Sequence, residues 1–87
     1  MRNKVINAVV ELLILSGEEN PRYSYNKEIA GYVFPINEFP ICSVSFELFL
    51  REEYSLHIRL SKIMLPIVKA KTLDSLYKKI NKLSKLY

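Results

Sequence analysis

Cysteine, glycine, histidine and tryptophan are scarce or absent in this sequence. Its 87 residues include one cysteine, one histidine, two glycines and no tryptophan. The lone Cys42 cannot form a disulfide within the chain, so the fold does not depend on an oxidising compartment and we expect a cytoplasmic location. The isolated Gly17 and Gly31 exclude a glycine-rich phosphate-binding loop. One histidine with one cysteine fits no zinc-binding spacing, so we expect no metal and no other cofactor.

A long apolar run is also missing. The segment Val5–Leu15 follows Arg2 and Lys4, as in a secretory signal, but Asn7 and Glu11 interrupt it. Its eleven residues fall short of the roughly 20 that a membrane-spanning helix needs. We therefore expect this segment to belong to the fold, and we expect no membrane partner.

What remains is the composition of one folded domain. Hydrophobic residues make up 49% of the chain and charged residues 25%, as in ordinary globular proteins. Two domains could not fit in this length. We expect a single domain over residues 1–87.

The first expected element is a helix capped by Asn3. Apolar residues recur at helical spacing from Val5 to Leu13, and asparagine is a favourable N-cap. Gly17 stands where a left-handed residue ends a helix. The polar strip of this helix is narrow, so its apolar surface exceeds what one sheet face covers. The helix is either enclosed within the fold or shared with a partner, and a homodimer through this helix is one way to cover it.

The middle of the sequence predicts an antiparallel sheet. Aromatic and β-branched residues indicate a strand over Glu28–Phe34, which the segment Pro35–Pro40 is expected to stop. Two alternating strands follow, and the loss of phase near Ser61–Lys62 indicates a bulge or the end of a strand. Pro66 restricts residues 67–70 to an edge strand or a short extended run. The sheet should therefore contain three to four strands.

The two alternating strands, residues 43–50 and 54–60, also predict their own register. Pairing Leu50 with Tyr54 brings the apolar residues of both strands together, in the pairs Leu48–Leu56 and Phe46–Ile58. A shift by one residue would turn one apolar set toward water, so this register, or one shifted by two, is favoured.

The same register sets Glu47 opposite His57 on the polar face, with Arg59 diagonally close. Opposite charges facing each other across strands contribute about 0.2–1 kcal/mol. Because histidine needs a partner to act as a base or a metal ligand, our first interpretation of His57 is a surface cross-strand partner.

The last expected element is a helix over about Leu73–Leu86, capped by Thr72. An arc of about 120°, the width of a core-facing stripe, contains Leu73, Leu76, Tyr77, Ile80, Leu83 and Tyr87. Helices at both ends of an antiparallel sheet normally pack on its apolar face. The predicted fold class is thus α+β, a two-layer sandwich with an N-terminal and a C-terminal helix.

Charge is divided unevenly along the chain. Residues 1–53 carry five basic and eight acidic side chains, whereas residues 54–87 carry eight basic side chains and Asp74 alone. The predicted binding residues are these eight: Arg59, Lys62, Lys69, Lys71, Lys78, Lys79, Lys82 and Lys85. Cations without counter-charges attract acidic surfaces and phosphate backbones. A lysine-rich helix face that serves only solvation explains the pattern equally well.

Aromatic residues exceed what two short helices can cover. Phe49 falls on the polar sheet face, and we expect it and Tyr32 to provide apolar contact with a partner. Alternatively, the segment Pro35–Pro40 folds over Phe49 and covers it.

These features favour a small non-enzymatic regulatory or inhibitory binding protein. It would occupy the surface of an acidic protein or nucleoprotein partner through its basic C-terminal face and exposed aromatics. The alternative is sequence-independent binding of the RNA or DNA backbone by the same lysines. A third hypothesis is a small ribonuclease-type toxin that uses His57, Arg59 and Tyr54, although Tyr54 points to the opposite sheet face. We assign no catalytic residue.

Overall fold

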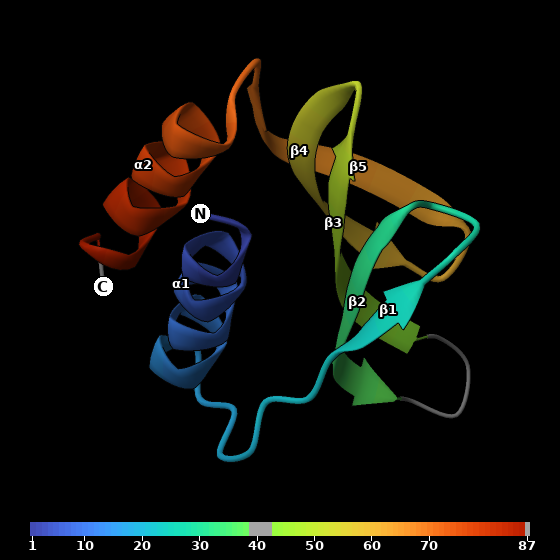
Figure 1. The fold of residues 1–87 in the computed structure, drawn as a ribbon. Helices are drawn as coiled ribbons and strands as arrows, with labels where there is room; N and C mark the ends of the chain where they lie inside the picture. The colour runs from blue at the N-terminus through green and yellow to red at the C-terminus, as the bar shows by residue number, and fades with distance from the viewer. Residues whose placement is uncertain (39–42, 87) are drawn as a thin grey trace.

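An antiparallel sheet and two helices make up the parts of the chain, residues 1–38 and 43–86, that the computed structural model describes. Figure 1 shows both helices on the same side of the sheet, which confirms the α+β class. The predicted number of three to four strands is wrong, because the sheet has five, in the order β1-β2-β3-β4-β5. The elements are α1 (Arg2–Leu15), β1 (Ser24–Asn26), β2 (Gly31–Glu38), β3 (Ser43–Arg51), β4 (Glu53–Leu60), β5 (Ile63–Ala70) and α2 (Leu73–Ser84).

The additional strand is β1, and β2 differs from its predicted course. β1 has three residues, too few for alternation to be visible in the sequence, and pairs with Gly31–Val33 of β2. β2 continues through Pro35, so the predicted stop there is wrong. Beyond Val33, β2 has no pairing with β1, and a proline is tolerated where one side of a strand is unpaired. A register shift between Pro35 and Asn37 marks the irregularity.

The predicted pairing of β3 with β4 is confirmed. Leu50 lies opposite Tyr54, and the expected apolar pairs Leu48–Leu56 and Phe46–Ile58 follow. The apolar set of this hairpin therefore lies under the helices, and its polar set lies on the other face of the sheet.

Of the two explanations for the loss of alternation near Ser61–Lys62, the end of a strand is correct, because β4 ends at Leu60. Ser61 and Lys62 form a turn, with Ser61 at a φ of 58°, and β5 begins at Ile63. β5 is an edge strand, as predicted, but it runs from Ile63 through Pro66 to Ala70 and is therefore longer than the predicted segment of residues 67–70.

α1 ends as predicted but begins earlier. Met1 is its N-cap, so Asn3 lies inside the first turn and is not the cap. At the other end, Gly17 has a φ of 106°. The backbone N–H of Gly17 donates to the carbonyl of Ile14 at 3.1 Å, and that of Glu18 donates to the carbonyl of Leu13 at 3.0 Å. These two bonds form a Schellman motif, for which glycine is the favoured residue.

The core lies between the helices and the sheet. α2 contributes the buried residues Leu76 and Ile80 to the core. α1 contributes more of them: Val5, Ile6, Ala8, Val9, Leu12 and Leu13. The buried apolar residues of the long strands are Phe34, Phe46, Leu48, Leu50, Leu56 and Ala70. Most apolar residues of α1 are thus covered by the fold, although Ile14 and Leu15 remain exposed. A homodimer through α1 stays a prediction.

Three sequence expectations fall outside the described residues. They concern Cys42, the position of Tyr87 on the helix stripe, and the covering of Phe49 by the Phe39–Pro40 part of the loop. Neither of the described helices has the length and apolarity required to cross a bilayer.

Candidate partner-binding surfaces

α2 is a capped amphipathic helix attached directly to the end of β5. The hydroxyl oxygen of Thr72 accepts a hydrogen bond from the backbone N–H of Ser75 at 3.1 Å, which confirms Thr72 as the N-cap. The helix ends at Ser84, two residues before the predicted end. Leu76 and Ile80 are buried, and Leu73, Tyr77 and Leu83 pack partly against the core. The predicted stripe therefore faces inward wherever it is described, and the lysines face outward.

The lysines of α2 are exposed and almost unneutralised. Lys78 pairs with Asp74 at 3.1 Å, but both side chains are more than half exposed, so the pair is weak. The ammonium group of Lys79 donates to the backbone carbonyl of Lys69 at 2.6 Å. Lys82 and Lys85 are exposed and make no ion pair with any described residue. The lysine surface, defined here as Lys78, Lys79, Lys82 and Lys85, therefore keeps most of its positive charge uncompensated.

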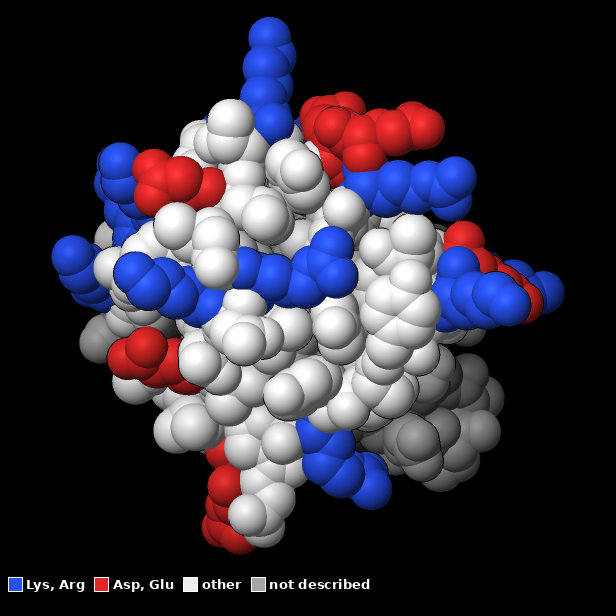
Figure 2. Space-filling model, viewed as in Figure 1, with Lys and Arg blue, Asp and Glu red and all other residues white. Residues whose placement is uncertain are grey.

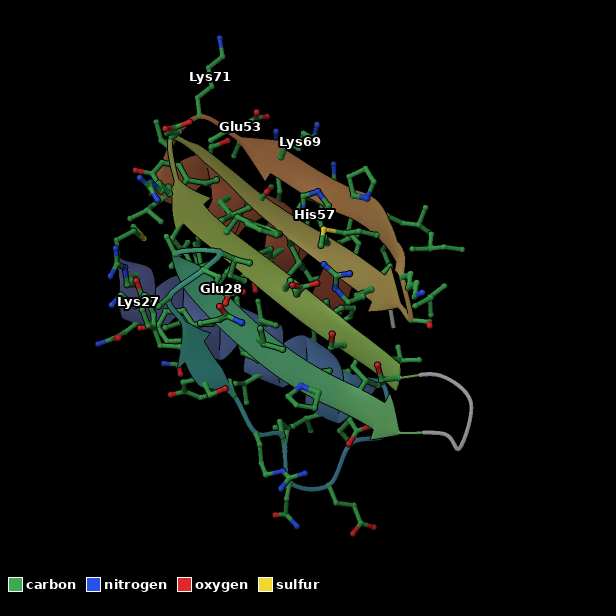
Figure 3. The ribbon with its side chains drawn as sticks, turned by 90° about the vertical axis from the view of Figure 1, so that its right-hand side faces the viewer. Lys27, Glu28, Glu53, His57, Lys69 and Lys71 are labelled. Carbon is green, nitrogen blue, oxygen red and sulfur yellow. The ribbon has the colours of Figure 1, made fainter. Side chains whose placement is uncertain are left out.

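A second group of cations meets the lysine surface at the junction of β5 and α2. Lys69, Lys71 and Lys79 line a shallow hollow of about 520 Å³, together with Glu53. Figure 3 shows Lys69, Lys71 and Glu53 at this end of the sheet. The contact of Lys79 with Lys69 connects the strand and helix cations, which sequence spacing alone did not reveal.

The eight basic residues predicted to bind a partner do not all lie together. Lys62 lies in the turn at the opposite end of β5 from Lys69. In Figure 2, basic side chains occupy separated groups and acidic side chains lie between several of them. The eight predicted binding residues therefore fall into three places. Six lie on the lysine surface or at the neighbouring hollow, Lys62 lies far from them, and Arg59 lies on the sheet.

Arg59 is engaged within the fold. Its neighbour Ile58 pairs with the core residue Phe46, so Arg59 projects from the other face of the sheet, the open face, which no described helix covers. The Nε of Arg59 donates to the Oε2 of Glu47. Glu47 is only 5% exposed, although it stands on this open face. The diagonal pairing predicted from the register is confirmed, and its consequence is that Arg59 is not free for a partner.

The two predicted aromatic contacts lie on opposite faces of the sheet. Phe49 is half-buried on the open face, and its ring meets the ring of His57 edge-on, with centroids 5.0 Å apart. Tyr32 packs against the core on the helix side and makes edge contacts with Tyr23 and Tyr25. Tyr23 and Tyr25 are themselves exposed. Sequence reasoning did not single them out, because β1 was not recognised.

His57 stands near the middle of the open face (Figure 3), in surroundings that disfavour its charge. Burial lowers its pKa below 6.5, and the nearby ammonium group of Lys69 lowers the pKa further. Glu47 and Glu53 act in the opposite direction but do not prevail. Its Nδ1 is buried and has no hydrogen-bond partner among the described residues. The neutral form of the imidazole therefore predominates at pH 7.

The chain's single histidine allows this pKa to be measured directly. In an NMR titration we expect the His57 pKa to lie below 6.5, to rise in Lys69→Gln and to fall in Glu47→Gln. Because the folded-state pKa is depressed, the unfolded state binds the proton more tightly. The free energy of unfolding should therefore decrease as pH falls below 6.5, and His57→Gln should lack this part of the decrease. A His57 pKa above 6.5 would contradict the assignment.

Besides the lysine surface and the open face of the sheet, the structure has an apolar surface that the sequence did not predict. Leu12, Phe46, Ile58, Ile67, Leu83 and Leu86 line a groove of about 350 Å³ on the helix side of the sheet. Its existence depends on where α2 lies relative to β5, which local sequence patterns do not encode.

Comparisons with protein-family models, with curated proteins and with solved structures find no match to this chain.

Proposed function

We propose that this chain is a small non-enzymatic regulatory or inhibitory protein that acts by occupying the surface of an acidic protein or nucleoprotein partner. The lysine surface, joined by Lys69 and Lys71, provides the charge. Phe49 and the exposed tyrosines Tyr23 and Tyr25 provide apolar contact. Arg59 and Tyr32 are omitted, because the first is paired with Glu47 and the second packs against the core.

The observation that carries this proposal is the near absence of counter-charges on α2. A helix that serves only solvation commonly mixes acidic residues with lysines at i,i+4, and such pairs add about 0.2–0.5 kcal/mol each. Here Asp74 is the one acid of the helix, and the like charges Lys78 and Lys82 stand one turn apart. Unpaired cations on a rigid, capped helix favour association with an acidic surface.

Capture of the partner from the native host tests the proposal. Lys82→Glu/Lys85→Glu should lose the captured protein, since two attractive charges become repulsive in a surface with few others. Arg2→Glu/Lys4→Glu is the matched control: both residues are exposed, the change in net charge is identical, and both lie on α1, which contributes none of the proposed contact residues. Equal capture by wild type and by Lys82→Glu/Lys85→Glu would contradict the proposal.

Direct binding of nucleic acid is the second candidate, and the hollow at the junction of β5 and α2 favours it. Three lysines line this hollow beside the first turn of α2, a position that suits phosphate. Glu53 in the same hollow and the separated basic groups of Figure 2 favour a protein partner instead. An electrophoretic shift with duplex RNA and DNA at two salt concentrations distinguishes the two. Strong, sequence-independent and salt-sensitive shifts would support the nucleic-acid candidate.

A ribonuclease-type activity is the third candidate. In its favour, Glu47, His57 and Arg59 meet on the open face, and such side chains serve in acid–base catalysis. Against it, Glu47 is buried and already bound by Arg59, and Tyr54 packs toward the core on the other face. Growth arrest on expression that His57→Ala relieves would replace the proposed function with this one.

A further inference from the structure

The apolar groove is continuous with exposed apolar side chains on β4 and β5. Leu65 lies opposite Ile58, which lines the groove, so both project from the helix side of the sheet. Leu60 and Ile63 pair with each other next to the turn and extend the same face. Leu65 is 46% exposed, Ile63 61% and Leu86, on the α2 side, 78%. A contiguous apolar surface of this kind indicates a site of association.

Lysines neighbour the residues of this apolar surface in the chain. Lys62 stands between Leu60 and Ile63, and Lys82 and Lys85 stand next to Leu83 and Leu86 in the chain. All three lysines are exposed.

The two acids that neighbour groove residues point elsewhere. Glu11 lines a different hollow with Lys4 and Asn81, and Glu47 lies on the opposite sheet face in its pair with Arg59. An occupant of the groove should therefore combine apolar side chains with acidic ones.

A second copy of the chain fits these charges poorly. Antiparallel pairing of two β5 edges would bring the Lys62 end of one strand toward the Lys69 end of the other, and each copy carries a net charge of +4. An added strand from another protein is also disfavoured, because Pro66 interrupts the series of N–H groups on β5. A helix needs no backbone hydrogen bonds from its groove and binds through side chains at i, i+3 or i+4, and i+7.

We infer that the groove between α2 and strands β3–β5 receives an amphipathic helix from an acidic protein partner. The apolar side chains of that helix enter the groove, and its acidic side chains lie opposite Lys62, Lys82 and Lys85. This inference rests on the proposed function and specifies the form of the partner's binding segment.

Designed peptides of about 18 residues, long enough to be partly helical, test the inference by fluorescence anisotropy. One peptide carries leucines on one helical face and glutamates on the rest, and the second replaces the leucines with alanine. The leucine peptide should bind the wild-type protein about tenfold more tightly than the alanine peptide, because its apolar side chains are buried on binding.

Two double variants locate the binding site. Leu65→Ser/Leu86→Ser should weaken binding of the leucine peptide about tenfold, and since both side chains are exposed in the free protein, the fold should persist. Ile14→Ser/Leu15→Ser removes apolar side chains that are also exposed, 52% and 46%, but do not line the groove. This control should leave the affinity unchanged.

Several results would overturn the inference, and they separate it from the proposed function. Equal affinities of the two peptides, or no effect of Leu65→Ser/Leu86→Ser, would exclude the groove while leaving the lysine surface as the binding site. If Lys82→Glu/Lys85→Glu bound both peptides with the same affinity as wild type, the proposed function would be excluded as well. A dimer detected by sedimentation equilibrium and dissociated by Leu65→Ser/Leu86→Ser would assign the groove to a second copy.

Discussion

Gly31→Ala is expected to lower the free energy of unfolding by about 3 kcal/mol or more. Gly31 is buried between β1 and β3, and a Cβ placed on it would lie 1.9 Å from the carbonyl oxygen of Leu48 and 2.9 Å from its carbonyl carbon. Both are backbone atoms of a central strand, so neither can move without disturbing the pairing of β2 with β3. A chain of this length is stable by only about 4–13 kcal/mol, so the loss is a large fraction.

The other glycine supplies the control for this prediction. Gly17→Ala meets no atom within 4 Å and suffers only from its positive φ, which should cost about 1 kcal/mol. Thermal unfolding followed by circular dichroism should therefore show a much larger decrease in Tm for Gly31→Ala, about 12–24 °C. Equal decreases in the two variants would contradict the close approach of β2 to β3.

Arg59→Met should destabilise the protein by about 2–3 kcal/mol, because it leaves a buried carboxylate without its charged partner. The Glu47 side chain is 6% exposed and that of Arg59 35%, so the loss concerns a largely desolvated anion. Methionine keeps much of the apolar stem of arginine and thereby limits the effect of lost packing. Urea unfolding of wild type and variant measures the difference.

The double variant Glu47→Gln/Arg59→Met identifies the source of that loss. A neutral amide at position 47 needs no cation, so the double variant should be more stable than Arg59→Met alone. If Arg59→Met costs less than about 0.5 kcal/mol, the pair behaves as an ordinary surface salt bridge. Such a result would contradict a buried, desolvated carboxylate at Glu47.

The β3–β4 hairpin was predictable because both strands alternate and a slip of one residue would expose an apolar set. α2 was predictable for a similar reason, since its stripe and its Thr72 cap are local in sequence. β1 was not predictable, because three residues are too few to show the alternation of a strand. The passage of β2 through Pro35 depends on the absence of a neighbouring strand there, which only the tertiary arrangement determines.

For the candidate surfaces too, some features follow from the sequence and others only from the tertiary structure. The outward direction of the α2 lysines follows from helical periodicity, and the structure agrees with it. The capture of Arg59 by Glu47 was implied by the register, but the burial of Glu47 was not. The apolar groove requires the relative placement of five elements, so no local pattern indicates it.

The most direct test of the central claim, that the lysine surface binds an acidic partner, is the salt dependence of affinity for the captured partner. Screening shortens the reach of exposed charges from about 30 Å at 0.01 M to about 8 Å at 0.15 M ionic strength. We predict that wild-type affinity falls steeply over this range and that Lys82→Glu/Lys85→Glu binds weakly throughout. Affinity that is independent of salt and unchanged in this variant would contradict the claim.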